Sequence, residues 1–254
     1  MEPIMEHNGQ TPAISLRDVR KSFGEQTVLR GVDLSVARGE TLTVLGRSGT
    51  GKSVLLKLLI GLQKPDNGEI EINGEEITSM PIDELNRVRK SVGFLFQGAA
   101  LYDSLTVEEN VAFPLRRHSK MNDGERRHRV RELLAAVGVE DAASKMPADI
   151  SGGMQKRVGL ARALALDPEI MLLDEPTAGL DPITADEINS LIRRLQEKHE
   201  TSSIVVTHDM RSVRTVADRV ALLKEGSIVV EGTLDEVSKN RDPFVSKFIE
   251  ECGR

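Results

Sequence analysis

Cysteine and tryptophan are almost missing from this chain of 254 residues, which holds one cysteine, Cys252, and no tryptophan. A single cysteine excludes an internal disulfide and fits a reducing compartment. Aromatic residues make up only 3% of the sequence, which gives little basis for a surface that stacks on nucleic-acid bases. The formal net charge of −6 also lacks the basic excess of most nucleic-acid-binding proteins. We therefore expect no nucleic-acid partner.

Long apolar runs are missing as well. No stretch approaches the ~18 apolar residues that a membrane span needs, and the first residues lack the charged-then-apolar pattern of a signal peptide. Charged residues make up 29% and hydrophobic residues 39% of the chain, as in soluble globular proteins. The length suits one well-buried α/β domain. We expect a flexible tail over residues 1–12 and a single domain over residues 13–250.

The apolar pattern predicts buried strands that alternate with helices. Such an alternation indicates a parallel sheet with helices on both faces. Helical spacing predicts a helix over 52–62 and a second one whose apolar face holds Ile183, Ile188, Leu191, Ile192 and Leu195. The continuous apolar segments that predict buried strands are 41–45, 91–96, 170–173 and 203–206.

Two other patterns interrupt this alternation. Apolar residues alternate with polar ones near both ends of the chain, which is typical of half-exposed antiparallel strands. Asn73-Gly74 and residues 224–227 predict hairpin turns there. The charged, helical middle of the chain, about residues 98–165, indicates a helical subdomain inserted into the core.

A glycine-rich segment, GRSGTGKS, matches the phosphate-binding pattern G-x-x-x-x-G-K-[ST] between a predicted strand and a predicted helix. Glycines let the backbone turn its N–H groups toward phosphate oxygens. Lys52 is expected to reach the β- and γ-phosphates, and the Ser53 hydroxyl to bind Mg²⁺. The strand–helix context disfavours the alternative, a chance glycine turn. The predicted nucleotide-binding residues are Gly46, Arg47, Ser48, Gly49, Thr50, Gly51, Lys52 and Ser53.

Two adjacent acids, Asp174 and Glu175, end the apolar strand at 170–173. Burying acids is costly unless they have partners or a function. Asp174 is placed to hold Mg²⁺ through water, and Glu175 to orient or deprotonate the attacking water. Without the phosphate-binding loop, a solvated pair of strand-end acids would be an equally good interpretation.

A second glycine-rich segment, Ser151-Gly152-Gly153, precedes a helix-like run. A helix start of this kind offers an N-cap and free N–H groups, which suit an anion. One γ-phosphate does not need two such cradles from one chain. A head-to-tail pair uses both, because each chain's Ser151 segment then caps the ATP on the other chain's loop. Taken alone, the three residues are better interpreted as an ordinary capped helix.

Two further polar residues end predicted strands. His208 can hydrogen-bond the γ-phosphate and help to position the water. Gln97 can contact both Mg²⁺ and the water. Each residue taken alone has a structural interpretation that is as good or better.

The ordered set of motifs resembles the ATP-binding-cassette (ABC) ATPase domain over nearly the whole chain. The resemblance implies an α/β fold: a P-loop NTPase core with a parallel sheet, an N-terminal antiparallel β subdomain and the inserted α-helical subdomain. It makes Gln97 the Q-loop residue, Asp174 and Glu175 the Walker B acids, and His208 the switch histidine. ATP and Mg²⁺ are then the expected ligands, and hydrolysis the expected activity.

The same resemblance assigns residues to the dimer interface and to the contact with the adenine base. The family signature is ISGGMQ, which adds Gln155 to Ser151, Gly152 and Gly153 as residues that face the partner's nucleotide. Asp181 belongs to the D-loop, which crosses the dimer interface. Phe23 falls where the family places an aromatic residue on adenine, although tyrosine is commoner there.

The segment FQGAALYDSLTVEENVAFPL, residues 96–115, resembles the ATPase subunits of Mla/Mce-type lipid transporters, and GRSGTGKSVLL and LDEPTAGLDPI point the same way. This implies a homodimer, bound peripherally at the cytoplasmic face of the inner membrane, that powers transport of a phospholipid or related hydrophobic cargo. Separate permease subunits are expected to dock near Gln97 to Tyr102. A periplasmic lipid-binding subunit and a small cytoplasmic accessory subunit are further expected partners.

Other functions stay open at this point. A non-transport ABC ATPase that regulates cell division or cofactor assembly is one alternative, and an importer ATPase for another solute is a second. A DNA-repair ATPase is set aside, because about 100 residues without heptads separate the loop from the signature. The seven Lys and Arg residues within 116–131 are better interpreted as a solvated helical face than as a lipid or partner contact.

Overall fold

The computed structural model describes residues 11–252, without the side chains of residues 251 and 252. Residues 1–10 of the expected tail and the Cys252 side chain therefore lie outside the described residues. Within the described range, no helix combines the length and apolar character needed to cross a membrane.

A six-stranded sheet forms the core, and four of its five neighbour pairs are parallel. Only β10 runs antiparallel, because it is joined to β9 by the hairpin predicted at residues 224–227. In spatial order the strands are β10 (Ser227–Gly232), β9 (Arg219–Lys224), β3 (Thr41–Leu45), β8 (Ser202–Thr207), β7 (Ile170–Asp174) and β6 (Val92–Leu95).

A second, antiparallel sheet is built from the N-terminal part of the chain. Its strands, in spatial order, are β2 (Gln26–Val36), β1 (Ile14–Phe23), β4 (Asn67–Ile72) and β5 (Glu75–Glu76). Asn73-Gly74 forms the β4–β5 turn, as predicted, with φ angles of +52° and +81°.

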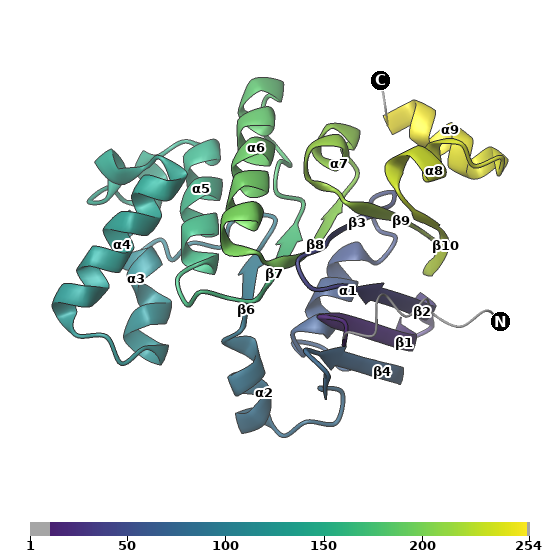
Figure 1. The fold of residues 1–254 in the computed structure, drawn as a ribbon, viewed down its shortest axis with the longest axis horizontal. Coiled ribbons are helices and arrows are strands. Elements are labelled where there is room, and N and C mark those ends of the chain that lie inside the picture. Colours follow the sequence, from purple (N-terminus) through teal and green to yellow (C-terminus); the bar gives the residue numbers. More distant parts are fainter. Residues whose placement is uncertain (1–10, 253–254) are drawn as a thin grey trace.

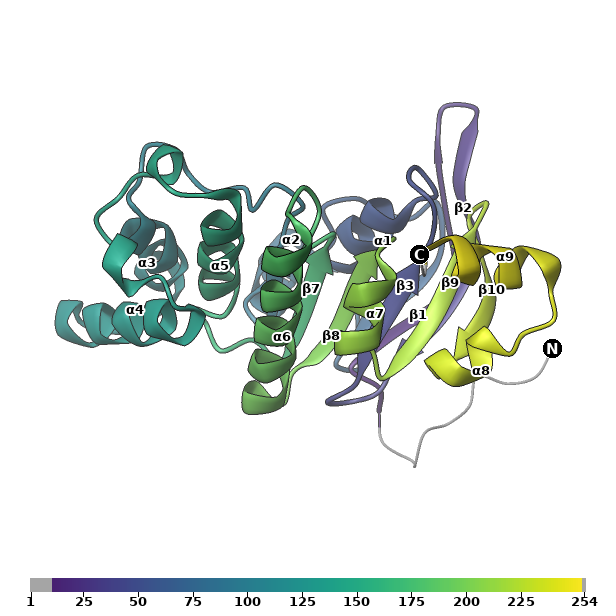
Figure 2. The ribbon, with the colours of Figure 1, turned by 90° about the horizontal axis from the view of Figure 1, so that it is seen from above.

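Helices cover both faces of the large sheet (Figures 1 and 2). Helices α6 (Pro182–His199) and α7 (Met210–Val216) lie on one face. Helix α1 (Lys52–Leu59) lies on the other, between the two sheets. The strands serve both faces by alternation, since Leu172 packs in the cluster around α1 and Leu173 in the cluster around α6.

The remaining helices lie at the ends and edges of the molecule (Figure 1). Three helices between β6 and β7 form the helical end, where the inserted subdomain is expected; its limits at about 98–165 stay a prediction. The bounds are α2 (Ile82–Arg89), α3 (Val107–His118), α4 (Asp123–Val137), α5 (Gly152–Ala163), α8 (Leu234–Ser238) and α9 (Pro243–Cys252), with 3-10 turns at Glu140–Ala142 and Pro147–Asp149. The predicted fold class is confirmed.

Helix α1 is shorter than the sequence predicts. The expected helix over 52–62 ends at Leu59, and Gly61 has a φ of +61°. A residue in this left-handed conformation ends an α-helix, and glycine adopts it without a Cβ clash. Leu62 therefore lies outside the helix and is 53% exposed.

The apolar face predicted for α6 is right except for Ile183. The other four residues are buried, whereas Ile183 in the first turn is 74% exposed. With 3.6 residues per turn, Ile183 points roughly 130° away from the mean direction of the buried four. Ile183 therefore has the apolar side chain of the predicted face but not the position around the helix that would bury it.

The start of α5 packs tightly against the start of α6. A Cβ added at Gly153 would lie 2.6 Å from Cγ2 of Thr184. Thr184 is fixed in turn by Asp181, whose carboxylate accepts a hydrogen bond from the Thr184 hydroxyl at 2.6 Å. Glycine at position 153 thus allows the two helices to approach each other.

This contact predicts a pair of compensating substitutions. Gly153→Ala should lower the urea midpoint, because overpacking costs about 1–3 kcal/mol and outweighs a helix-propensity gain of at most ~1 kcal/mol. Thr184→Ser removes Cγ2 but keeps the hydroxyl that Asp181 binds, so the double variant should regain the lost stability. If Gly153→Ala is as stable as the wild type while Thr184 is present, the contact is not as close as described.

Candidate functional site

The carboxyl ends of three adjacent parallel strands bring the predicted chemistry together. Gly46 follows β3, Glu175 follows β7 and His208 follows β8. Strands β3, β8 and β7 are neighbours in the sheet, so these residues meet at one edge. Ligands of α/β sheets bind at this edge.

The phosphate-binding loop has the backbone that its glycines predict. Gly49 and Gly51 have φ angles of +81° and +104°, a region that favours glycine. A Cβ at Gly46 would lie 2.7 Å from the Leu223 carbonyl oxygen. Gly51 is the N-cap of α1, so the loop leads directly into the N-terminus of a helix. Arg47, Ser48 and Gly49 are exposed at the rim.

Lys52 links this loop to the acids of β7. Its ammonium donates to the carbonyls of Gly46 at 2.8 Å and Arg47 at 3.1 Å, and lies 3.4 Å from a Glu175 carboxylate oxygen. The side chain is only 5% exposed. Lys52 therefore sits between the loop carbonyls and the carboxylate that the sequence assigns to catalysis.

The second contact across the site joins Ser53 to Asp174. The Ser53 hydroxyl donates to Oδ1 of Asp174 at 2.9 Å. Burial raises the pKa of Asp174 above its usual range, and the hydrogen bond from Ser53 only partly opposes this shift. The pair places a hydroxyl and a carboxylate oxygen side by side, the donor type that Mg²⁺ prefers.

Glu175 is buried like its neighbour Asp174, with 7% of its surface exposed. Its carboxylate lies 2.9 Å from Nδ1 of His208 and accepts a hydrogen bond from the Thr207 hydroxyl at 3.3 Å. Its backbone is in the left-handed region, with φ of +44°, and its N–H donates to the Val206 carbonyl at 2.9 Å. The His208 side chain is 55% exposed and so remains open on its other side.

Other predicted residues lie apart from this cluster. Ser151 is the exposed N-cap of α5, and its hydroxyl accepts from the Met154 N–H at 3.3 Å. Both views place α5 on the far side of α6 from α1 (Figures 1 and 2). Asp181 likewise caps α6 and is exposed. Gln155 donates to the Pro147 carbonyl at 2.9 Å, within the helical end.

Phe23 and Gln97 are both exposed, the first at the end of β1 and the second after β6. Phe23 ends β1, is 45% exposed, and has the Lys21 ammonium 5.4 Å from its ring centre. Gln97 follows β6 and is exposed, while its backbone carbonyl accepts a hydrogen bond from Lys156. The assigned roles of both residues stay predictions.

Two contacts of the site were missed by the sequence analysis. Thr207 donates to Glu175, and Lys156 also donates to the Glu175 carbonyl at 3.2 Å. Lys156 shares the buried side of α5 with Gly153 and Leu160. The sequence did hold one sign of this contact, because Lys156 has the helical spacing of the buried residues of α5.

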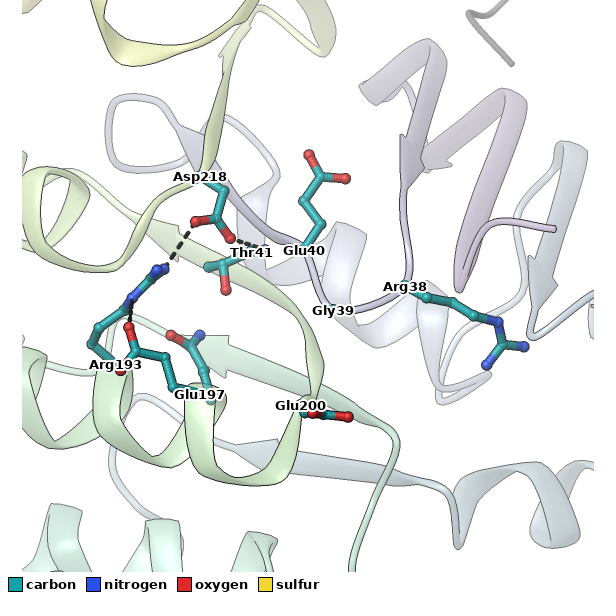
Figure 3. A pocket seen from close by; sticks show the side chains of 9 residues that line it. Arg38, Gly39, Glu40, Thr41, Arg193, Glu197, Glu200 and Asp218 are labelled. Carbon is teal, nitrogen blue, oxygen red and sulfur yellow. Dashed lines mark hydrogen bonds and ion pairs between the residues drawn. The ribbon is translucent and has the colours of Figure 1, made fainter. Parts of the chain in front are cut away.

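A hollow of about 680 Å³ lies at the opposite end of β3, where Thr41 begins the strand (Figure 3). Arg193 pairs there with Asp218 at 2.9 Å and with Glu197 at 2.8 Å. Asp218 also accepts the Thr41 N–H at 2.8 Å. These groups partner one another and brace α6 against the sheet, away from the phosphate-binding loop.

Residues 29–178 match the protein family described as ABC transporter. The methionine import ATP-binding protein MetN of Brucella abortus (strain 2308) is 45% identical over 229 residues, which cover 90% of this chain and 62% of MetN. The chloroplastic protein TRIGALACTOSYLDIACYLGLYCEROL 3 of Arabidopsis thaliana is 42% identical, over 95% of this chain and 74% of that protein. The probable ribonucleotide transport ATP-binding protein mkl of Mycobacterium tuberculosis (strain CDC 1551 / Oshkosh) is 41% identical, over 93% and 66%. The chain thus spans less than two thirds of MetN and of mkl.

Solved structures agree with this match. A dimeric ATP-binding cassette in a post-hydrolysis state, bound to ADP and Pi, is 37% identical with a TM-score of 0.80, over 87% of this chain and 98% of that chain. The cbiO1 protein of Clostridium perfringens, part of the ABC transporter complex cbiONQ, is 29% identical with a TM-score of 0.82, over 95% and 100%. At the level of the family, the predictions of an ABC ATPase and of ATP with Mg²⁺ are confirmed. The chain belongs to the ABC transporter family, as one of its ATP-binding cassettes.

Proposed function

We propose that this chain hydrolyses ATP as one of two identical subunits, and that a separate permease uses the cycle to move a phospholipid or related hydrophobic molecule. The observation that carries the ATPase proposal is the contact of Glu175 with both Lys52, at 3.4 Å, and His208, at 2.9 Å. These contacts join the phosphate-binding loop, the carboxylate of Glu175 and the switch histidine in one chain.

ATP with Mg²⁺ fits the residues at this site. The loop offers its N–H groups and the N-terminus of α1 to the phosphates, and Lys52 adds a positive charge. Ser53 and Asp174 would hold Mg²⁺, with Gln97 as the further expected contact. Among the described residues there is no group of three or more His, Cys, Asp and Glu for a metal, so the other ligands would be phosphate oxygens and water. When bound, Mg²⁺ neutralises charge on the β- and γ-phosphates.

Glu175 is the residue that would take the proton of the attacking water. A general base must lie within hydrogen-bond reach of that water and be held in one orientation. His208 and Thr207 hold the carboxylate, and its burial keeps bulk water from competing. The exposed side of the His208 ring is available to the γ-phosphate.

The position of Ser151 supports a site shared between two chains. Ser151 caps an exposed helix start on the far side of α6 from the chain's own loop (Figure 1). Such a start binds anions well. Asp181 lies at the neighbouring start of α6, and Gly153 packs against Thr184 of that turn. We propose that this surface covers the nucleotide bound by the partner.

A groove beside Gln97 supports a permease contact. It has a volume of about 440 Å³. Its lining combines aromatic residues with basic ones: Phe94, Phe96, Tyr102 and Phe113, and Arg89, Lys90 and Arg162. Tyr102 is 46% exposed. Aromatic residues are enriched where proteins bind partners. We propose that permease helices dock here, which would place the chain peripherally at the inner membrane.

Two observations support a lipid cargo. Residues 96–115, beside this groove, resemble the Mla/Mce-type subunits, and the Arabidopsis relative carries the name of a glycolipid. A second candidate is import of a small solute, which the 45% identity to the methionine import protein MetN favours. The two proposals share the same ATPase cycle and differ only in the permease and its cargo.

The role of Glu175 predicts a loss of turnover without a loss of binding. Glu175→Gln should lower the ATPase rate by about 10²-fold or more, because general-base catalysis contributes that much. Affinity for ATP should remain, since the loop is unchanged. Turnover and nucleotide titration measure the two effects, with the exposed Glu132→Gln as a control. Near-normal hydrolysis by Glu175→Gln would remove Glu175 from this role.

The cargo proposal predicts the composition of the native complex. When the chain is purified from membranes under mild conditions, a multi-span permease and a lipid-binding periplasmic subunit should accompany it, with bound phospholipid detectable by mass spectrometry. A permease that holds methionine or another small solute would support the second candidate instead. Purification without any membrane protein would favour a regulatory ABC ATPase.

A further inference from the structure

We infer that Lys156 is a positioning residue of the ATPase site, which ties helix α5 to the backbone of both Gln97 and Glu175. This inference rests on the ATPase activity proposed above. It concerns a residue outside the phosphate-binding loop, the strand-end acids and the switch histidine.

The ammonium of Lys156 bridges two segments that are far apart in the sequence. It donates to the Gln97 carbonyl and, at 3.2 Å, to the Glu175 carbonyl. Gln97 is the second residue after β6, and Glu175 directly follows β7; the two strands are adjacent in the sheet. One charged group therefore fixes the exits of two strands relative to a helix of the helical end.

Burial makes this a costly group to keep. Lys156 is only 5% exposed, and both of its acceptors are main-chain carbonyls instead of carboxylates. Burial lowers the pKa of Lys156, and the nearby charges of Asp174 and Glu175 oppose that shift. An apolar side chain of similar size would avoid the cost of burying a charge, although it would leave the two carbonyl acceptors without this hydrogen bond. Stability alone is therefore a weak reason for lysine here.

The segments that α5 holds have unusual backbone conformations. Glu175 has a φ of +44°, and Ala99 and Ala100, just after Gln97, have φ angles of +59° and +48°. Non-glycine residues in this region cost about 1–3 kcal/mol each and need surrounding support. Arg162 of α5 donates to the carbonyls of Ala99 at 2.6 Å and Ala100 at 2.7 Å. The same helix thus supports both Glu175 and the segment after Gln97.

Helix α5 connects three places that the proposed cycle must coordinate. Its N-cap is Ser151, its middle carries Lys156 and its last turn carries Arg162. At ~1.5 Å per residue, the helix spans roughly 18 Å as one rigid rod. A movement of the Ser151 end would pass through Lys156 to the Glu175 carbonyl. Lys156 therefore sets where the Glu175 carboxylate lies when the site is assembled.

The test separates this role from simple packing. Lys156→Met fills similar space without an ammonium, Lys156→Arg keeps a charged donor, and the exposed Lys145→Met in the same helical end is the matched control. Turnover number, KM, ATP affinity by titration and melting temperature are measured on the full-length chain. Lys156→Met should lose at least about tenfold in kcat, because small misplacements of catalytic groups are costly. KM and ATP affinity should stay close to wild type, and Lys156→Arg should recover part of the rate. The melting temperature should fall by only a few degrees, because the loss of two hydrogen bonds is partly offset by the removal of a buried charge.

Two results would overturn the inference. A Lys156→Met chain with wild-type kcat shows that the ammonium does not position Glu175. A chain that loses ATP affinity and melting temperature together with kcat, and that Lys156→Arg does not rescue, shows a purely structural role. Lack of ATPase activity in the wild-type chain would instead sink the proposed function itself.

Discussion

The buried carboxylate of Glu175 is the group on which the rest of the site depends. It lies where β7 ends. Its partners are Lys52 at the start of α1, and Thr207 and His208 at the end of β8. The partners lie at or after the ends of two neighbouring strands, β3 and β8, so the position of the acid depends on the alignment of β3, β8 and β7 in the sheet. The carboxylate would be costly to bury without these partners. The alignment of the strands that forms the core therefore also fixes the position of the carboxylate.

The helical end adds a second constraint through α5. The strained exits after β6 and β7 are not held by the sheet alone, because Lys156 and Arg162 reach them from the helix. Gly153 seats the other end of that helix against α6. In this account, Ser151 on the proposed partner-facing surface and Glu175 in the chain's own site are parts of one connected body. A partner that moves the helix also changes the geometry of the acid.

Sequence patterns predicted what is local along the chain. The phosphate-binding loop and the strand-end acids are each read within a few residues, and the alternation of strands and helices yields the fold class. Contacts between distant segments carry no such pattern, and Lys156 meets Gln97 across 59 residues. Leu62 and Ile183 were misplaced for a related reason, since a left-handed Gly61 and a helical phase decided their exposure. The shared site cannot be read from one chain's motifs without assuming a partner.

The claim that two chains close around ATP is tested most directly by mass in solution. Sedimentation of Glu175→Gln with ATP and Mg²⁺ should show the 27.9 kDa chain doubling its mass, because bound ATP is retained and each Ser151 segment caps the partner's nucleotide. ADP should leave it monomeric, and adding Ser151→Arg should abolish the ATP-dependent dimer while ATP still binds. A chain that stays monomeric with ATP, or that dimerises equally well with Ser151→Arg, would contradict the shared site.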